Sequence, residues 1–357
     1  MIKKRLAALR ALFKEKDLDA VLVTKIPNLY YFSGFRGDDT ILLITKAKAF
    51  LVTDSRYTEQ AAAEAPLYEL VEQKTGLLMQ TAALAKSLNL KNVGFEGADM
   101  SYETHARLTK LMDGIRLTEA LRLDSLREIK DEGEIENIRK ACEIADIAFK
   151  DVCTFIHAGV TEIEVAARLE EVMRRAGSEK PSFDTIVASG LRGSMPHGTA
   201  TQKPIEAGDF VTMDFGAKYQ GYCSDITRTV VVGKASERQR EVYAAVLETQ
   251  KNVLDAIAPG KSGRKIDALA RDNLKRYDLA QYFGHGLGHS LGLEIHEEPR
   301  LSRYSTCESL VPGMLVTDEP GVYLPDWGGI RIEDTVLVTK DGAEPLTKCS
   351  KELIELN

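Results

Sequence analysis

The sequence lacks several features that would place it in a specialised class of protein. It has five cysteines, an odd number with no CxxC pair, so a disulfide framework is not expected and a reducing, cytoplasmic compartment fits best. No uncharged apolar run approaches the roughly 20 residues that span a bilayer. No apolar stretch follows the basic N-terminus as it would in a signal peptide. The net charge of −7 makes a nucleic acid an unfavourable partner.

The composition and the element pattern predict a globular chain with two α/β domains. Hydrophobic residues make up 44% of the 357 positions, which is enough to form cores without a structural metal. Short β-rich runs alternate with helical patterns over residues 1–124, as in a small α/β domain. A helical period from Asp131 to His157 then opens a second domain over residues 125–357. Residues 30–39 are expected to form an aromatic, glycine-punctuated loop.

One candidate hairpin carries two aspartates. β-rich runs flank the turn-like residues 216–221, and a turn centred between Tyr219 and Gln220 puts Asp214 opposite Asp225. Directly opposed side chains lie about 4.5–5.5 Å apart at Cβ, where like charges are destabilising. The pair would need a cation or a proton between its members. In a different register, both aspartates would simply be exposed near a turn.

A second candidate hairpin at residues 314–339 repeats this design. Glu319 and Glu333 are symmetric about Asp326, which lies in a Pro/Gly-rich loop. Two such hairpins indicate internal pseudo-symmetry. Four converging carboxylates would carry too much charge without one or two dications. Hard oxygen ligands favour Mg, Ca or Mn, and mixed oxygen and nitrogen sets also suit Co or Zn.

Histidines gather in one glycine-rich segment. Residues 283–299 hold three of the six histidines: His285, His289 and His296. His289 stands where a phosphate-binding loop needs its third glycine. Gly286 and Gly288 would each cost about 1 kcal/mol inside a metal-binding helix. The glycines instead permit a close backbone approach, as at a crowded metal site. His197 follows a predicted strand in a Gly/Pro loop, a common place for a site residue.

Five separated motifs resemble the pita-bread metallopeptidase family (M24) of aminopeptidase P, prolidase and methionine aminopeptidase. In chain order they are SFDTIVASG…PHG, VTMDFG…YCSDITRT, GHGLGHSLGLEIHEEP, VTDEPG and GIRIEDT. The preceding third, with YYFSGF…LLIT and LREIKDEGEIENIRKA, resembles the N-terminal domain of the creatinase, prolidase and aminopeptidase P branch. The resemblance therefore implies an α/β (α+β) chain in which a creatinase/prolidase-like domain precedes a pita-bread catalytic domain.

The resemblance also implies a site. A dinuclear metal centre would have Asp225 and Glu333 as bridging ligands within the set Asp214, Asp225, His289, Glu319 and Glu333. The implied catalytic residues are His197, His296 and Glu319. Further candidates for the substrate pocket are His285, Arg331, Tyr222 and Tyr323, with core packing as the alternative for the tyrosines. Ser290 departs from the usual Gly-His-Gly around the histidine ligand.

The implied function is hydrolysis of Xaa-Pro bonds by a hydroxide activated between two divalent ions, with Mn first and Co or Zn as alternatives. Substrates would be peptides with proline at the second position, cleaved as by an aminopeptidase P or by a prolidase. A methionine aminopeptidase- or creatinase-like hydrolase and a non-catalytic peptide-binding relative are the alternatives. A homodimer is also expected, in which loop 33–39 of one subunit approaches the other subunit's active site; an ordinary solvated turn is the alternative.

Overall fold

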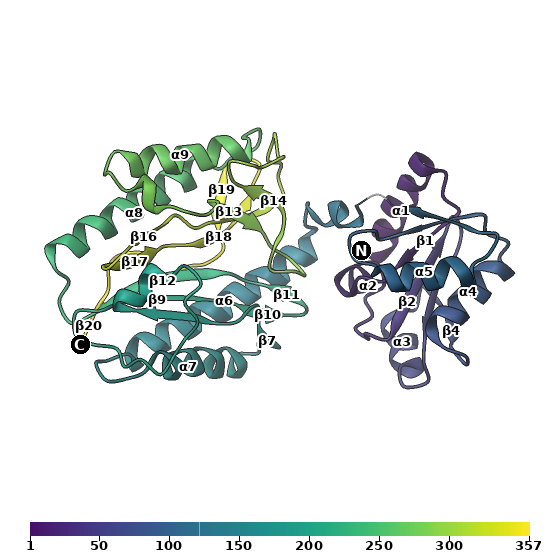
Figure 1. The fold of residues 1–357 in the computed structure, drawn as a ribbon, viewed down its shortest axis with the longest axis horizontal. Coiled ribbons are helices and arrows are strands. Elements are labelled where there is room, and N and C mark those ends of the chain that lie inside the picture. Colours follow the sequence, from purple (N-terminus) through teal and green to yellow (C-terminus); the bar gives the residue numbers. More distant parts are fainter. Residues whose placement is uncertain (121) are drawn as a thin grey trace. The chain divides into compact units, whose positions relative to one another are not determined.

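The computed structural model describes residues 1–120 and 122–357, and the chain divides into two compact units, Met1–Arg127 and Glu128–Asn357. Each unit combines helices with β-sheet (Figure 1). Among the described residues, no helix is both long and apolar enough to cross a membrane. All five cysteines carry free thiols.

The first unit is built on a mixed six-stranded sheet in the order β4-β3-β2-β1-β5-β6. Its strands are β1 Ala20–Val23, β2 Thr40–Thr45, β3 Ala49–Thr53, β4 Glu69–Glu72, β5 Asn92–Phe95 and β6 Arg116–Glu119. The central strands β1, β2 and β3 pair antiparallel, whereas β4, β5 and β6 join parallel to their neighbours. The central strands are buried except at Thr45, the last residue of β2, which explains their continuous apolar runs.

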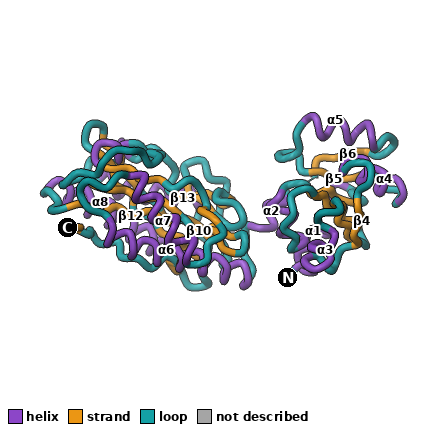
Figure 2. Tube along the Cα trace, turned by 90° about the horizontal axis from the view of Figure 1, so that it is seen from below, coloured by secondary structure: helices purple, strands orange, loops and turns teal. Residues whose placement is uncertain are grey.

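Helices cover this sheet on both sides (Figure 2). They are α1 Ile2–Leu12, α2 Ile26–Ser33, α3 Thr58–Glu64, α4 Leu77–Ser87 and α5 Tyr102–Leu111. The prediction of a loop over residues 30–39 is wrong for its first four residues, which complete α2. Pro27 lies in the first turn of that helix, where a missing N–H costs nothing, and Gly34 ends it with φ 82°.

Four long helices frame the second unit. They are α6 Glu132–Phe155, α7 Glu162–Arg175, α8 Glu237–Ala256 and α9 Gly263–Lys275. Capping boxes begin three of them, at Asp131, Thr161 and Ser236. The strands of this unit lie between the pair α6–α7 and the pair α8–α9 (Figure 1). The first pair packs on one hydrophobic cluster and the second pair on another.

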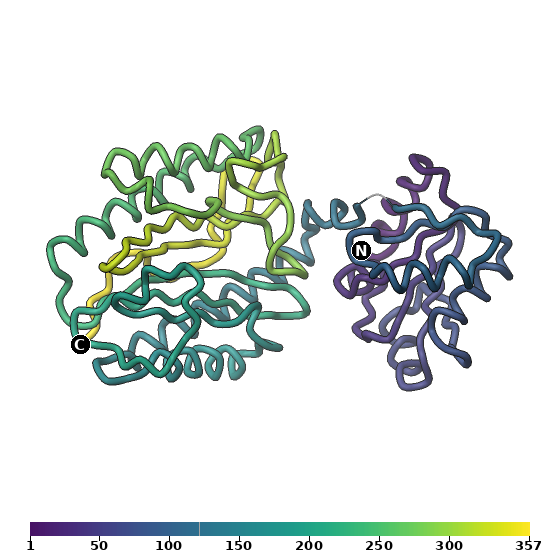
Figure 3. The backbone as a smooth tube through the Cα atoms, in the orientation of Figure 1, coloured from purple at the N-terminus to yellow at the C-terminus, as the bar shows by residue number. Residues whose placement is uncertain are grey.

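The strands of the second unit form several small sheets. Their bounds are β7 Lys180–Pro181, β8 Ile186–Ser189, β9 Phe210–Phe215, β10 Ala217–Tyr219, β11 Tyr222–Cys223, β12 Ile226–Val232, β13 Gly288–Ser290, β14 Glu297–Leu301, β15 Leu315–Asp318, β16 Gly321–Leu324, β17 Gly328–Arg331, β18 Asp334–Val338, β19 Ala343–Pro345 and β20 Glu355–Leu356. Strands β20-β12-β9-β8 form one sheet, and β15-β18-β19 form another. The C-terminal strand β20 returns to pair with β12, as the yellow end of the tube shows beside the teal segment (Figure 3).

Candidate active site

The first acidic hairpin has a different register from the one predicted. Strand pairing places Thr227, not Asp225, opposite Asp214. The turn is centred between Gln220 and Gly221, whose φ angles of 48° and 80° are both positive, as a type I′ turn requires. The predicted turn centre is therefore one residue too early, and the direct pairing of Asp214 with Asp225 is wrong.

The two aspartates nevertheless meet. Asp225 precedes Thr227 by two positions, and strand side chains repeat their face every two residues. The corrected register therefore places Asp225 diagonally across from Asp214 on the same face, within reach of it. Ligand oxygens of Asp214, Asp225 and Glu333 all lie within 4.8 Å of one another. The convergence predicted from the sequence thus holds, although the pairing that suggested it does not.

The register of the second hairpin agrees with the prediction. Its tip is Asp326, which has a φ of 58°. Paired residues on both sides of Glu319 and Glu333 are symmetric about that tip: Asp318 with Asp334, and Gly321 with Arg331. Glu319 follows β15 and Glu333 precedes β18, so the pairing places these residues opposite each other at the junction between the β15–β18 and β16–β17 ladders.

The three carboxylates of Asp214, Asp225 and Glu333, which we call the carboxylate cluster, could hold a divalent cation. Within the described part of the chain, Oδ1 of Asp214 and Oδ1 of Asp225 are buried and have no hydrogen-bond partner. Burial, together with the charges of Glu333 and Asp214, raises the pKa of Asp225 well above its ordinary value. Burial and the charge of Glu319 likewise raise the pKa of Glu333. A bound dication would supply the missing partners and offset this repulsion.

His289 presents a neutral ring nitrogen to this cluster. Its Nδ1 donates to the backbone oxygen of Ser290 at 3.1 Å, which leaves Nε2 as the lone-pair nitrogen. That Nε2 lies 3.6 Å from Asp225 Oδ2 and 3.6 Å from Glu319 Oε1. Burial and the neighbouring His296 lower the pKa of His289 to about 3. The imidazole is therefore neutral at pH 7 and suited to bind a metal.

Ser290, which replaces the second glycine of the usual Gly-His-Gly, contacts a buried charge pair next to His289. Its hydroxyl accepts a hydrogen bond from Nζ of the buried Lys130 at 2.9 Å. The same Nζ lies 3.3 Å from Oε2 of Glu297, on the neighbouring strand β14. The serine thus joins a buried charge pair that supports strands β13 and β14, and His289 keeps its own contacts.

Glu319 has the properties of a proton-transfer group. Burial raises its pKa to about 8, with the charge of Asp214 adding to the shift and Arg331 opposing it. Its Oε1 accepts a hydrogen bond from Thr317 Oγ1 at 3.2 Å, which fixes the carboxyl group. A carboxyl with a pKa near the working pH can both accept and release a proton.

Arg331 links the cluster to the wall of the cavity. The buried guanidinium contacts Asp214 Oδ2 at 2.6 Å, Thr227 Oγ1 at 3.0 Å and the hydroxyl of Tyr323 at 2.6 Å. Because a guanidinium only donates, the Tyr323 oxygen accepts from it and directs its own proton to His285 Nε2 at 2.8 Å. Burial and the Arg331 charge lower the pKa of His285 to about 4, so this imidazole is neutral.

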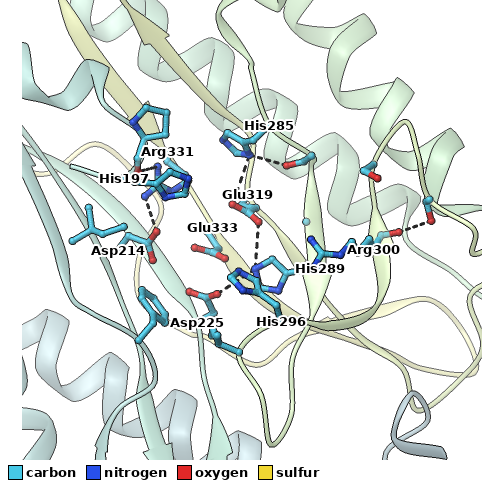
Figure 4. Close-up of a pocket in the computed structure, with 18 of the residues that line it drawn as sticks. His197, Asp214, Asp225, His285, His289, His296, Arg300, Glu319, Arg331 and Glu333 are labelled. Atoms are coloured by element: carbon cyan, nitrogen blue, oxygen red, sulfur yellow. Dashed lines mark hydrogen bonds and ion pairs between the residues drawn. The ribbon is translucent and has the colours of Figure 1, made fainter. Parts of the chain in front are cut away.

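These side chains surround one cavity of about 720 Å³. Figure 4 shows the carboxylates and histidines pointing toward a common space. His197 reaches it from the loop after the short 3-10 turn Gly190–Ser194, and His296 from the segment before β14. The ring of His296 packs edge-on against that of His289, with 4.5 Å between centroids. The cavity lining thus includes every residue predicted for the site except one.

Tyr222 is that exception. It is not among the residues that line the cavity. Its side chain is buried, and its hydroxyl donates to Oε1 of Glu134 on α6 at 3.1 Å. The prediction that Tyr222 shapes the substrate pocket is therefore corrected to a packing role between β11 and α6.

Arg300 lines the cavity and was missed in the sequence. It lies on β14, it is exposed, and its Nε is 3.7 Å from Oε1 of Glu298. The available signal was its position four residues after His296, a predicted substrate-facing residue. Without the β13–β14 pairing, that spacing did not show which side of the strand faces the site.

Comparisons with known proteins agree with this geometry. Residues 136–340 match metallopeptidase family M24, and residues 5–129 match the creatinase/prolidase N-terminal domain. A Xaa-Pro dipeptidase of Pyrococcus furiosus is 42% identical over 358 residues, covering 99% of this chain and 100% of that protein. The structure of a Xaa-Pro dipeptidase from Bacillus anthracis is 44% identical, with a TM-score of 0.97 and complete coverage of both chains. An X-Pro aminopeptidase structure from Thermotoga maritima is 38% identical, with a TM-score of 0.91, covering 95% of this chain and 98% of that one.

Proposed function

The chain belongs to metallopeptidase family M24, and from that membership we propose that it hydrolyses the peptide bond before proline. The observation that carries the proposal is the carboxylate cluster, whose two buried oxygens, Asp214 Oδ1 and Asp225 Oδ1, lack partners in the described residues. This cluster opens into a cavity that the neutral His285 and His289 also line. Two divalent ions per chain, Mn first and Co or Zn as alternatives, would be held by Asp214, Asp225, His289, Glu319 and Glu333.

Bound dications would supply Lewis-acid polarisation of the scissile carbonyl and of the attacking water. Glu319 takes the proton of that water on its carboxylate and passes it to the departing nitrogen. In the metal-free protein burial raises the pKa of this carboxyl to about 8. Bound dications would lower that pKa, so that the carboxylate form would be present at neutral pH to accept the proton. His197 and His296, on the cavity wall, donate hydrogen bonds to the developing oxyanion and to the substrate backbone.

Selection for proline rests on shape. The nitrogen of a Xaa-Pro bond carries no hydrogen, so the site has no N–H of the scissile bond to recognise. Arg331, Tyr323 and His285 are already bonded to one another and form a fixed wall of the cavity. A wall whose polar groups are satisfied internally can contact a pyrrolidine ring without leaving a polar group unpaired.

The exposed Arg300 on the cavity wall favours a dipeptide as substrate. In a dipeptide the proline carries a free carboxylate, and a guanidinium binds carboxylates in a two-pronged geometry. Arg331 is committed to Asp214, whereas Arg300 is placed to receive that carboxylate. We therefore favour a dipeptidase over an aminopeptidase acting on longer peptides.

The deciding experiment compares turnover of Gly-Pro, Gly-Pro-Gly and Gly-Ala. The proposal expects Gly-Pro to be hydrolysed well and Gly-Ala poorly, with the tripeptide cleaved slowly. Arg300→Gln should lower kcat/KM for Gly-Pro about tenfold or more and leave Gly-prolinamide, which has no carboxylate, nearly unchanged. Preferred cleavage of the tripeptide would instead indicate an aminopeptidase. If Arg300→Gln lowered kcat/KM equally for Gly-Pro and for Gly-prolinamide, Arg300 would have no role in binding the carboxylate.

We also propose a homodimer in a reducing, cytoplasmic compartment, where the five thiols would stay free. Loop 33–39 of one subunit would approach the active site of the other. Its Arg36 is exposed and stacks over the Tyr30 ring at 5.1 Å, an arrangement from which it could turn to a substrate carboxylate. A monomer in sedimentation at assay concentration would remove this part of the proposal.

A further inference from the structure

A buried glutamate lies beneath the loop that carries His197. Glu162, the first residue of α7, is 0% exposed. Its carboxylate accepts hydrogen bonds from the backbone N–H and hydroxyl of Ser189 at 2.8 and 2.9 Å, and from those of Thr201 at 3.1 and 2.7 Å. A fifth bond comes from the guanidinium of Arg192. The start of a helix also favours a negative charge at this position.

These donors come from both ends of one segment. Ser189 ends β8 and Thr201 follows the turn that contains His197, so one carboxylate ties the two ends of residues 189–201 together. Arg192, inside the segment, bridges the carboxylate to the backbone oxygen of Thr199 at 2.9 Å. The segment is therefore closed at its base, while His197 at its far end lines the cavity.

The same segment is also fitted against the second acidic hairpin. A Cβ on Gly193 would lie 2.9 Å from the backbone nitrogen of Gly329, so only glycine allows this approach to β17. Nη1 of Arg331 lies 3.4 Å from the backbone oxygen of Pro196, the residue before His197. The segment is therefore held at two places, by Glu162 at its base and by β17 and Arg331 along its length.

We infer that Glu162 is a positioning residue, which fixes the 189–201 segment and thereby holds His197 at the cavity wall. The inference rests on the proposed function for the role of His197 in catalysis. Glutamine matches the size of glutamate but offers one acceptor oxygen and an amide that donates, so it cannot accept all five bonds. A carboxylate is therefore required at this position.

Kinetics on Gly-Pro test the inference through a double-mutant cycle. Glu162→Gln should lower kcat/KM about 10–100-fold, as for other residues that orient a site group. In a His197→Ala background the same change should have less than a twofold further effect, because its target is already gone. An undiminished loss in that background would overturn the inference, because Glu162 would then act on another part of the site.

Asp146→Asn is the matched control. Asp146 is also buried and accepts from the backbone nitrogens of Lys348 and Cys349 at 2.8 and 3.0 Å, but it is not among the cavity residues. This variant should lower the melting temperature and leave kcat/KM within twofold of wild type. A loss of activity equal to that of Glu162→Gln would mean that general destabilisation explains both, and would overturn the inference.

Hydrogen exchange supplies a readout that does not depend on activity. Amides of residues 190–200 should exchange at least tenfold faster in Glu162→Gln than in wild type or in Asp146→Asn. Unchanged exchange would overturn the inference even if activity falls.

A wild-type protein without Xaa-Pro activity would remove the proposed function, while the exchange result would still decide whether Glu162 holds the segment. If Glu162→Gln does not fold, Thr201→Val takes its place and should show smaller changes in both kcat/KM and hydrogen exchange. Thr201→Ser keeps the hydroxyl and should behave like wild type. Wild-type kinetics and exchange in Thr201→Val would overturn the inference.

Discussion

Asp214 and Arg331 form an ion pair in which only one carboxylate oxygen takes part. Oδ2 of Asp214 lies 2.6 Å from Nη2 of Arg331, while Oδ1 is buried and, among the described residues, has no partner. The guanidinium therefore orients the carboxylate and leaves one oxygen directed to the cluster with Asp225 and Glu333. Arg331 also contacts Tyr323, so the same side chain supports both the candidate metal ligands and the cavity wall.

Arg331→Lys should lower both metal affinity and kcat/KM by about 10–100-fold. A lysine keeps the charge but cannot hold Asp214, Thr227 and Tyr323 together in the geometry of a planar fork. Metal dissociation constants and Gly-Pro kinetics would measure the change. Arg168→Lys is the control, because Arg168 also pairs with an aspartate, through both carboxylate oxygens of Asp151, but away from the cavity. Wild-type metal affinity in Arg331→Lys would contradict this account.

Glu319→Gln should abolish turnover and retain at least one metal ion. The amide cannot accept and pass on a proton, and losing such a group costs about 10²–10⁴-fold in rate. Asp214, Asp225 and Glu333 remain to bind an ion. Single-turnover kinetics and metal analysis of the same sample would separate the two effects. A near-normal kcat would show that another group transfers the proton.

The stability of the metal-free protein should fall as the pH rises from about 6.5 to 8. In this window the unfolded chain has a deprotonated Glu319, whereas the folded protein keeps the proton because its pKa is about 8. The unfolded state then binds fewer protons, so the free energy of unfolding decreases with pH, by up to about 1.4 kcal/mol per unit and proton. His285 and His289, with folded pKa values of about 4 and 3, oppose this decrease near pH 6.5, and their effect fades as the unfolded imidazoles lose their protons toward about pH 7.5.

Melting temperatures of chelated wild-type and Glu319→Gln protein across that window provide the measurement. The variant should show a shallower pH dependence, and saturating metal should flatten the wild-type curve. Wild-type stability that rises between pH 6.5 and 8 would contradict the raised pKa of Glu319.

Two tyrosines offer a matched pair of substitutions. Tyr323→Phe removes a hydroxyl bonded to both Arg331 and His285 in the cavity, so kcat/KM should fall about tenfold or more. Tyr222→Phe removes a hydroxyl bonded to Glu134 outside the cavity lining, so stability should fall by about 1 kcal/mol with activity nearly unchanged. Steady-state kinetics and denaturant unfolding of both variants would show the contrast, and an equal loss of activity would contradict the placement of Tyr222.

Much of the site could be predicted because hairpin symmetry and strand period are local properties of the sequence. The symmetry of Glu319 and Glu333 about Asp326 was correct, since the Pro/Gly-rich loop marks its own centre. The predicted pairing of Asp214 with Asp225 is wrong by one residue at the turn centre. The reason is that Gln220 adopts a positive φ in the turn, which is not expected for a residue other than glycine, asparagine or aspartate. Period 2 kept both carboxylates on one face, so the prediction of their convergence survived the error. The family assignment from five ordered motifs is confirmed.

Features that depend on tertiary contacts could not be read from the sequence. Tyr222 neighbours a candidate ligand in sequence, yet its side chain packs on α6, a helix formed some 70–90 residues earlier. Arg300 and Glu162 belong to none of the five motifs. The role of Arg300 depends on the β13–β14 pairing, and that of Glu162 depends on the contact of residues 189–201 with α7. The aromatic, glycine-flanked sequence of residues 30–33 predicts a loop, whereas in the structure these residues form the last turn of α2.

The most direct test of the central claim is the number of divalent ions bound per chain. Equilibrium dialysis of chelated protein against Mn²⁺ should give two ions per chain and restore Gly-Pro hydrolysis. Bound Mn²⁺ should also raise the free energy of unfolding by about 2.7 kcal/mol when the free Mn²⁺ concentration is a hundred times Kd. Asp225→Asn should bind metal more weakly, gain less in melting temperature and lose activity by orders of magnitude. Full activity in metal-free protein, or wild-type stoichiometry and turnover in Asp225→Asn, would contradict the account.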